Sequence, residues 1–350
     1  MQFCIYFYLK RMKSVKFLFM FALAISVAFT SCKKDDDDDS TMPSIGGDIT
    51  YDLPLYAFVN QRINLEATGV TEPAEGVSYK WLCKGLRKDT VKTPDIELTI
   101  PDSLATFSVQ LTLSADNYYS RTVTKNVTSV LEGYNGSLTG IPRANDSIRD
   151  RRDNRWYHIA VIGNLEWFTQ NLNWKGAGQG YAKTDAMASV MGRLYTWEDA
   201  TNGVSGSGLG NGPQGVCPEG WSIPTNEDWM DLAKALNGGT ELPFVDNWKG
   251  LGEKVTVDAR FNGNKVWPYS ANATPANMFQ WNALAAGSCT NDYNNYSGLF
   301  SYAFWWSSTE KSATDANYRY IYYDQPDFPL NYTGKNGFGA SVRCVRLKSN

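Results

Sequence analysis

Few side chains in this sequence could carry out nucleophilic or metal chemistry. The chain has a single histidine, His158, and six cysteines, at positions 4, 32, 83, 217, 289 and 344. One imidazole cannot build a zinc site from several histidines, and any Ser–His–Asp or Cys–His centre would have to use His158. His158 lies in the alternating stretch WYHIAVI, which is typical of a β-strand and favours a structural role. We therefore expect no catalytic residue and a protein that is not an enzyme.

Cys32 follows a hydrophobic run near the N-terminus. Residues 10–16 carry four basic and no acidic side chains, and residues 17–30 form an apolar stretch of 14 residues. A membrane-spanning helix needs about 20 apolar residues, so this stretch fits a signal peptide better. The small residues Thr30 and Ser31 before Cys32 resemble the lipobox of bacterial lipoproteins. The resemblance implies a signal peptide over residues 1–31 and lipidation of Cys32.

Residues 32–46 are expected to form an acidic tether. Five consecutive aspartates, 35–39, follow two lysines, and such a run stays solvated because its charges repel one another. The stretch is either a plain spacer or an export signal, since it also resembles the charged motif of Bacteroidetes lipoproteins that reach the outer leaflet. Together with the multiply acylated cysteine, this implies lipid anchoring to the outer membrane, exposure at the cell surface and no spanning segment.

The chain that remains after removal of residues 1–31 is acidic. Its 319 residues keep 29 of the 33 Lys and Arg residues and all 36 Asp and Glu residues, which gives a net charge of −7. It has no basic stripe, so nucleic acid is not an expected partner. Its length is sufficient for two domains of typical size.

Residues 47–130 have the pattern of an all-β domain. Apolar and polar residues alternate in three stretches, at 62–67, 77–82 and 107–113. Asn, Gly and Pro clusters separate these stretches at short intervals, as in a β-sandwich. The strand with Tyr79 and Trp81 resembles PKD-like, immunoglobulin-type modules of bacterial surface proteins. The resemblance implies an immunoglobulin-like sandwich with Trp81 in its core, which acts as a spacer.

The composition changes after residues 131–144, a glycine-containing junction that we interpret as a linker. Eleven of the twelve tryptophans lie in 156–306. One amphipathic helix is expected, because Thr225 is a suitable N-cap, Asp228 can complete a capping box and Gly238 can end the helix. A helix beside many short strands indicates an α+β domain.

Six blocks of the C-terminal half occur in the order of one known family. They are DRRDNRW with the strand that follows, GRLYTWEDA, CPEGWSIPT, WNALAAG, FWWSSTE and GASVRCVR. These blocks resemble the Fibrobacter succinogenes major paralogous domain and cover nearly all of 145–347. The resemblance implies a C-type-lectin-like α+β fold for residues 145–350. The chain is thus expected to be multidomain, with an all-β immunoglobulin-like sandwich followed by this domain.

The fold of that family implies a disulfide between Cys217 and Cys344, because it brings the loop before the helix next to the last strand. Such a bond is compatible with an exported protein. Cys83 and Cys289 are expected to stay unpaired, with a bridge between the two domains as the alternative.

Ligand contacts are expected from aromatic residues in Asn- and Gly-rich stretches, which could stack on a sugar or contact a protein. These candidates are Trp248, Trp267, Tyr269, Tyr293 and Tyr296. The alternative is that they are ordinary surface aromatics, which occur without any ligand. Gln325 and Asp327 belong to a Gln-Pro-Asp triplet that resembles the sugar-specificity triplet of calcium-dependent lectins. Apart from Ca²⁺ at this triplet, no cofactor is expected.

Three functions compete. The first is a non-catalytic surface lipoprotein whose stalk presents a lectin-like module for adhesion, or for capture of a glycan or protein ligand. The second is a structural subunit of a surface assembly. The third is an oxidoreductase related to formylglycine-generating enzymes, which use a related fold and a reactive cysteine pair; Cys217, Cys289 and Cys344 lack that close pairing.

Overall fold

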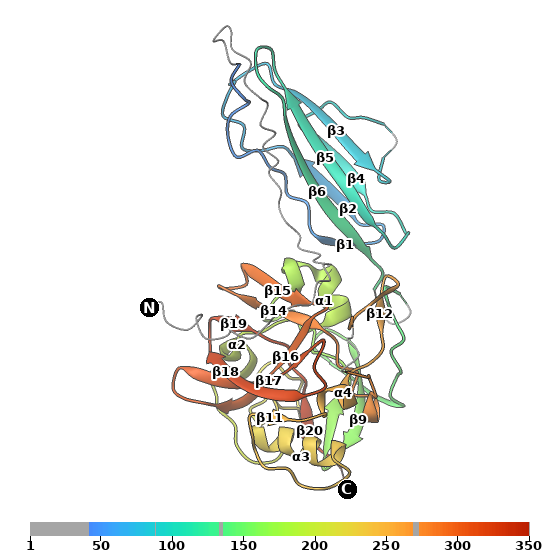
Figure 1. Cartoon of the computed structure of the whole chain (residues 1–350), viewed down its shortest axis with the longest axis vertical. Helices are drawn as coiled ribbons and strands as arrows, with labels where there is room; N and C mark the ends of the chain where they lie inside the picture. Colours follow the sequence, from blue (N-terminus) through green and yellow to red (C-terminus); the bar gives the residue numbers. More distant parts are fainter. Residues whose placement is uncertain (1–41, 88, 133–135, 269–272, 350) are drawn as a thin grey trace, which may run out of the picture. The chain divides into compact units, whose positions relative to one another are not determined.

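The computed structural model describes residues 42–349 except 88, 133–135 and 269–272 (Figure 1). Cys32, the predicted signal peptide and most of the predicted tether lie outside the described residues. Strands predominate within the described part and helices are few, as expected of a β-rich chain. None of the helices described there has the length and apolar character needed to cross a membrane.

Two β-sheets share one hydrophobic core in the N-terminal part. The larger sheet has the order β1 (Tyr56–Phe58), β6 (Arg121–Val130), β5 (Thr106–Ser114) and β3 (Ser78–Lys84), and the smaller one pairs β2 (Arg62–Glu66) with β4 (Asp95–Thr99). Alternate side chains of each strand point inward, such as Ile63 and Leu65 of β2. Trp81 is fully buried in this core, which confirms its predicted position.

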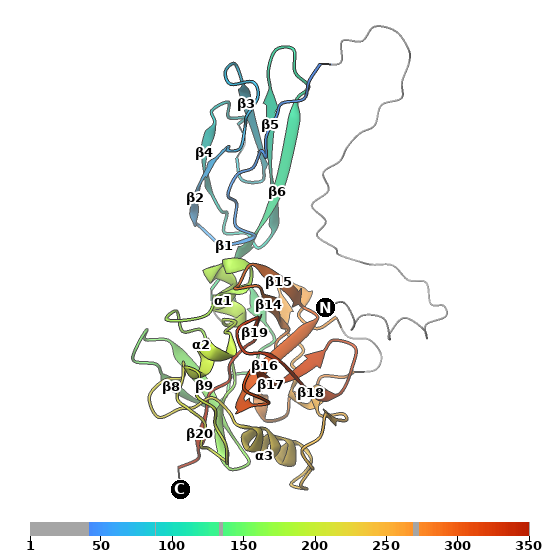
Figure 2. The same cartoon turned by 90° about the vertical axis from the view of Figure 1, so that its left-hand side faces the viewer.

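The C-terminal part contains three further sheets (Figures 1 and 2). The first consists of β20 (Val345–Leu347), β10 (Leu165–Phe168), β9 (Trp156–Ile162) and β8 (Asp146–Arg149). The largest has the order β11 (Asn247–Trp248), β18 (Phe328–Gly334), β17 (Asp315–Tyr322), β16 (Tyr302–Glu310), β14 (Ala286–Thr290) and β15 (Asn295–Leu299), with β19 (Phe338–Gly339) on β14. The small third sheet joins β13 (Asn264–Lys265), β12 (Arg260–Phe261) and β7 (Leu138–Thr139).

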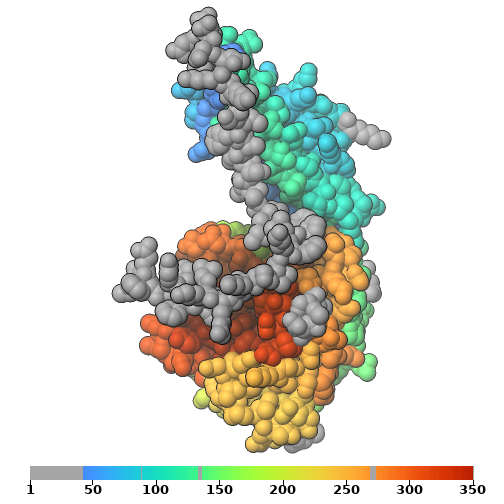
Figure 3. Space-filling model, in the orientation of Figure 1, coloured from blue at the N-terminus to red at the C-terminus, as the bar shows by residue number. Residues whose placement is uncertain are grey.

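Short helices connect these strands. They are η1 (Tyr181–Lys183), α1 (Asp185–Met191), α2 (Trp197–Thr201), α3 (Asn226–Leu236), α4 (Gly252–Val255) and η2 (Met278–Gln280). In the space-filling view, the later segments, coloured yellow to red, form one continuous surface (Figure 3). Ten of the twelve tryptophans are buried, Trp174 is partly exposed and Trp156 is exposed. Trp156 therefore stands apart from the others, whose large apolar rings fill the cores.

The predicted helix is α3, and its ends are those that the sequence indicates. The Thr225 hydroxyl accepts a hydrogen bond from the Asp228 N–H, and the Asp228 carboxylate accepts one from the Thr225 N–H, so the capping box is complete. At the other end Gly238 adopts φ 68°, and the Gly239 N–H donates to the Lys234 carbonyl. This is the pattern of a Schellman motif, which satisfies carbonyls of the last turn.

The predicted disulfide between Cys217 and Cys344 is present, with their Cα atoms 5.8 Å apart. It joins the loop before α3 to the segment that leads into β20. Cys83 and Cys289 are unpaired and buried, as predicted. The cysteines that the structure describes therefore form one disulfide and two buried thiols.

Candidate functional site

Two of the predicted ligand-binding aromatics lie in the core. Trp248 and Trp267 are buried, and their indole N–H groups donate to the carbonyls of Pro243 and Ala283, respectively. The Arg319 guanidinium covers the Trp248 ring at 3.4 Å from its centroid. Neither indole offers a face to a ligand, so the structure contradicts their predicted role. The physical reason is that packing against distant segments buries these rings, although the flanking sequence looks like loop.

Two of the predicted tyrosines, Tyr293 and Tyr296, contact other parts of the fold. The Tyr293 hydroxyl donates to the Asp199 carboxylate and accepts a hydrogen bond of 2.9 Å from the Thr196 N–H. The Tyr296 ring packs edge-on against another tyrosine ring, with centroids 5.3 Å apart. Tyr269 lies outside the described residues, so its role stays a prediction. Tyr293, Tyr296, Trp248 and Trp267 do not line the pocket described below.

The Gln325–Asp327 triplet has a structural partner on each carboxylate oxygen. Asp327 Oδ2 accepts a hydrogen bond of 2.7 Å from Asn247 Nδ2, and Oδ1 accepts one of 2.9 Å from the Gly250 N–H. The carboxylate thus joins the start of β18 to the turn after β11. Gln325 is exposed. A calcium ion would have to share these oxygens with the two N–H donors. The described part of the chain holds no cluster of three His, Cys, Asp or Glu residues suited to a metal.

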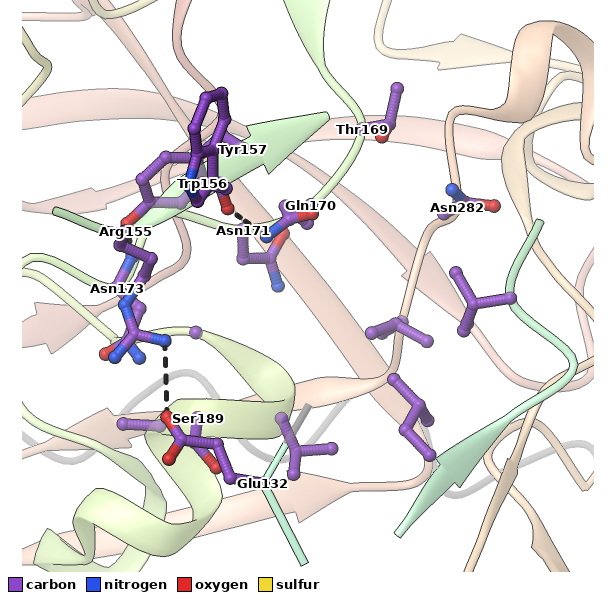
Figure 4. A pocket seen from close by; sticks show the side chains of 16 residues that line it. Glu132, Arg155, Trp156, Tyr157, Thr169, Gln170, Asn171, Asn173, Ser189 and Asn282 are labelled. Carbon is purple, nitrogen blue, oxygen red and sulfur yellow. Dashed lines mark hydrogen bonds and ion pairs between the residues drawn. The ribbon is translucent and has the colours of Figure 1, made fainter. Parts of the chain in front are cut away.

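A pocket of about 230 Å³ lies elsewhere, beside the start of β9 (Figure 4). Five segments that are distant in sequence line it. They contribute Glu132, Leu138 and Ile141; Arg155 to Tyr157; Thr169 to Asn171 and Asn173; Ala188 to Val190 and Gly192; and Asn282 and Leu284. Aliphatic side chains, amides and one arginine therefore face the same space.

A buried arginine outside the lining, Arg343, holds part of the pocket wall in place. Its Nε donates to Asn171 Oδ1 at 2.8 Å, and its Nη2 donates to the Asn282 carbonyl at 2.8 Å. Asn171 Nδ2 in turn donates to the Met191 carbonyl at the end of α1. These bonds tie three of the lining segments to one cation. Asn171 thereby serves as part of the scaffold of the pocket.

Two polar atoms of the pocket lining are not committed in this way. Asn173 is 5% exposed, and its Oδ1 is buried with no hydrogen-bond partner among the described residues. Arg155 Nε is likewise buried and has no partner there. Leaving a buried polar group unsatisfied costs about 1–3 kcal/mol. A ligand that offers a donor to Asn173 and an acceptor to Arg155 would recover that free energy.

Trp156 lies at the rim of this pocket with 59% of its surface exposed. Its carbonyl accepts a hydrogen bond from Gln170 Nε2, drawn as a dashed line in Figure 4. The backbone of Trp156 is therefore held while its indole remains available to a ligand. We did not predict this residue as a contact, because it belongs to a family block in which most aromatics are core. Its position at the end of a charged turn, DRRDNR, is the signal that could have identified it.

The pocket holds no arrangement suited to covalent catalysis. Its lining contains no cysteine, histidine or aspartate. The Ser189 hydroxyl donates to the Ala186 carbonyl, and the Thr169 hydroxyl donates to the His158 carbonyl. His158 does not line the pocket, and its Nδ1 lies 3.1 Å from the Ala144 carbonyl. Neither of these two hydroxyls of the lining thus donates to a carboxylate or an imidazole side chain.

Comparison with known proteins places the C-terminal half in a family. No curated protein matches the chain. Among solved structures, SGBP-B of the Bacteroides ovatus mixed-linkage glucan utilization locus, in complex with a mixed-linkage heptasaccharide, is similar at 12% identity and a TM-score of 0.19. The similarity covers 40% of this chain and 34% of that one, so this chain spans about a third of that structure, and a likeness of this extent says nothing about a ligand. The model of the Fibrobacter succinogenes major domain matches residues 161–346, which is more than half of the sequence. The chain belongs to the Fibrobacter succinogenes major domain family.

Proposed function

We propose that the protein is a lipid-anchored, non-catalytic protein of the bacterial cell surface that binds a glycan in the pocket beside β9. One observation carries the proposal: the exposed indole of Trp156 borders a pocket in which Asn173 Oδ1 and Arg155 Nε have no partner within the described chain. Binding sites for small ligands combine apolar surface with a few convergent polar groups, and this pocket has that composition.

The ligand class follows from the chemistry of these groups. A sugar ring has an apolar face of C–H groups, which stacks on an aromatic ring, and a rim of hydroxyls, which donate and accept hydrogen bonds. Trp156 supplies an aromatic surface, and the amide and guanidinium supply an acceptor and a donor. The proposed ligand is therefore a glycan, and the pocket volume suits one sugar unit with its neighbours lying outside.

The proposed architecture assigns a task to each part of the chain. The first 31 residues direct export, Cys32 carries the lipid, and the acidic tether 32–46 extends from the outer membrane. The two-sheet part over 47–130 acts as a PKD- or immunoglobulin-like spacer, and the linker 131–144 joins it to a C-type-lectin-like domain over 145–350. Mass spectrometry of the N-terminal peptide tests the anchor: a lipidated Cys32 supports it, and an intact unmodified leader contradicts it.

The remaining cysteines support a non-catalytic protein. Cys217 and Cys344 form a disulfide, which leaves Cys83 and Cys289 as the free thiols that the structure describes. Burial raises the pKa of Cys289 to about 12 and also raises that of Cys83. A reactive cysteine needs thiolate character and access, and both thiols lack these properties.

A glycan-array screen of the purified full chain in detergent, with calcium and with chelator, tests the proposal. We expect binding that does not depend on calcium, and a loss of about tenfold or more in the Trp156→Ala variant, since aromatic anchors dominate binding energy. Tyr332→Ala is the matched control, because Tyr332 is also an exposed aromatic and does not line the pocket. Full binding by Trp156→Ala would place the site elsewhere. Absence of binding to any glycan would contradict the proposal and favour a structural subunit of a surface assembly.

A further inference from the structure

We infer that the glycan recognised by this pocket carries a carboxylate, as a uronic acid unit does, and that Arg155 binds it in competition with Glu132. The inference rests on the proposed function and names its ligand class. It starts from the guanidinium of Arg155, which has the weakest pairing that the structure records for an arginine bound to a carboxylate.

A neighbouring arginine in the same turn shows what complete pairing looks like. Arg152 donates from Nε and Nη2 to the two oxygens of the buried Asp150 carboxylate, at 3.0–3.2 Å and 2.7 Å. Arg155 has nearly the same side-chain exposure, 28% against 27% for Arg152. Its contact with a carboxylate is a single one, from Nη1 to Glu132 Oε1 at 3.7 Å. This distance is beyond the 2.7–2.9 Å of a charge-assisted hydrogen bond.

The Arg155 side chain borders the pocket and is 28% exposed. Nε is the buried atom without a partner in the described chain, and the residue lines the pocket (Figure 4). An arginine binds a carboxylate through two parallel N–H donors, which makes the planar anion a better match than a lone hydroxyl. Glu132 is exposed over 59% of its side chain, so it is a weak and replaceable counter-ion.

The second free atom defines the rest of the ligand. Asn173 Oδ1 is an acceptor and needs a donor, which a carboxylate cannot supply at neutral pH. The same molecule must therefore carry a hydroxyl donor beside its anion. Leu138, Ile141 and Leu284 add an apolar wall to the pocket. An anion, hydroxyls and an apolar ring face occur together in a sugar acid.

The alternative ligand is a neutral sugar. Removal of the Glu132 charge should affect the binding of a neutral sugar and of a sugar acid differently. A neutral sugar leaves the Arg155–Glu132 pair in place, so removal of the Glu132 charge should not change its affinity. A sugar acid has to displace Glu132, so the same change should strengthen its binding.

The experiment is titration calorimetry of the full chain with oligogalacturonate, oligomannuronate and a glucuronate-containing oligosaccharide, each beside its methyl ester. We expect at least one free acid to bind about tenfold or more tightly than its ester, as the loss of a charged hydrogen-bonded pair predicts. Arg155→Gln should abolish this preference, and Glu132→Gln should raise the affinity for the acid severalfold while leaving that for the ester unchanged. Arg62→Gln, which removes an exposed positive charge on β2, is the matched control.

The outcomes separate the two proposals. Equal affinity for acid and ester in the wild type, or an acid preference that survives in Arg155→Gln, would overturn the carboxylate inference. If glycan binding still depended on Trp156 in that case, the proposed function would stand. If no glycan bound at all, both proposals would fail. Should Arg155→Gln not fold, the response of the exposed Glu132→Gln variant alone decides, since an unchanged affinity for the acid would contradict displacement.

Discussion

Arg343 is a fully buried arginine whose guanidinium contacts neutral acceptors and an aromatic ring. Its guanidinium donates to Asn171 Oδ1 and to the carbonyls of Phe168, Trp281 and Asn282, and lies over the Trp281 ring at 4.2 Å from the centroid. Neutral acceptors and an aromatic face together replace its hydration shell. The residue thereby connects the end of β10 with the segment that precedes β14.

Replacing Arg343 should destabilise the protein strongly. We expect Arg343→Met to lower the free energy of unfolding by about 3 kcal/mol or more, because several buried acceptors lose their donor at once. Urea denaturation followed by tryptophan fluorescence measures the change. Arg346→Gln is the control, since its pair with Glu166 is partly exposed and should contribute about 1 kcal/mol or less. Equal effects of the two substitutions would contradict this account.

Asp228 predicts a pH dependence of stability. Burial raises the pKa of this carboxyl from 3.8 to about 6, although hydrogen bonds from Gly210 and Thr225 oppose the shift. The folded state then holds the proton more tightly than the unfolded state. The stabilisation is complete below about pH 4 and is lost as the pH rises through about 6.

The wild type should therefore lose up to about 3 kcal/mol relative to Asp228→Asn between pH 4 and pH 7. Unfolding free energies of both proteins across this range give the difference, in which the titration of all other groups cancels. A difference that stays constant with pH would show that Asp228 titrates normally.

At the scale of single elements, α3 shows how local chemistry ends a helix. Gly238 follows its last turn with φ 68°, a conformation that side chains with a Cβ adopt at a cost of roughly 1–2 kcal/mol. A Cβ at Gly238 would meet no atom within 4 Å, so the cost of Gly238→Ala is purely conformational.

We expect Gly238→Ala to lower the free energy of unfolding by about 1 kcal/mol. Gly337→Ala is the control, because its Cβ would also meet no atom within 4 Å and its φ is not positive. That change should be neutral or stabilise the fold by a few tenths of a kcal/mol through the unfolded state. Chemical denaturation of both variants tests the contrast, and a larger loss at Gly337 would refute it.

Elements defined by local patterns were predictable from the sequence. Alternation over 62–67 and 107–113 predicted β2 and β5 to within a residue or two at each end, and Thr225 with Asp228 predicted the start of α3. The order of the family blocks led to the disulfide.

The pocket was not predictable in this way. Its lining comes from five segments that lie far apart in the sequence, so no local pattern contains them together. Trp248 is a residue whose burial could not be predicted from its neighbours in the sequence. An Asn- and Gly-rich surrounding suggests a loop, but the ring is buried because Arg319 reaches it from β17. Burial of a single ring depends on which distant side chain covers it. Neither the spacing of apolar residues nor the local composition identifies that side chain.

At the scale of the whole molecule, the disulfide and most of the tryptophans lie in the same part of the chain, the C-terminal part. Eleven of the twelve tryptophans lie in 156–306, and the disulfide joins Cys217 to Cys344. Fluorescence therefore follows unfolding of the C-terminal part, where the disulfide acts. The two-sheet part contributes Trp81 alone and has no disulfide in the described residues.

The disulfide closes a segment of 127 residues, and a constraint of this size removes much of the freedom of the unfolded chain. We expect reduction of the wild type, or the double substitution Cys217→Ala and Cys344→Ala, to lower the free energy of unfolding by roughly 2–5 kcal/mol. The double variant is its own control for the reductant, because without this bond dithiothreitol should leave its denaturation curve unchanged. Dithiothreitol should lower the denaturation midpoint of the wild type to that of the double variant.

The opposite result has two parts: dithiothreitol leaves the denaturation curve of the wild type unchanged, and both Cys217 and Cys344 are alkylated in the denatured protein without reductant. This result would show that the bond does not form. In that case the loop before α3 and the last strand would be held together by packing alone, and the oxidoreductase hypothesis would regain two thiols.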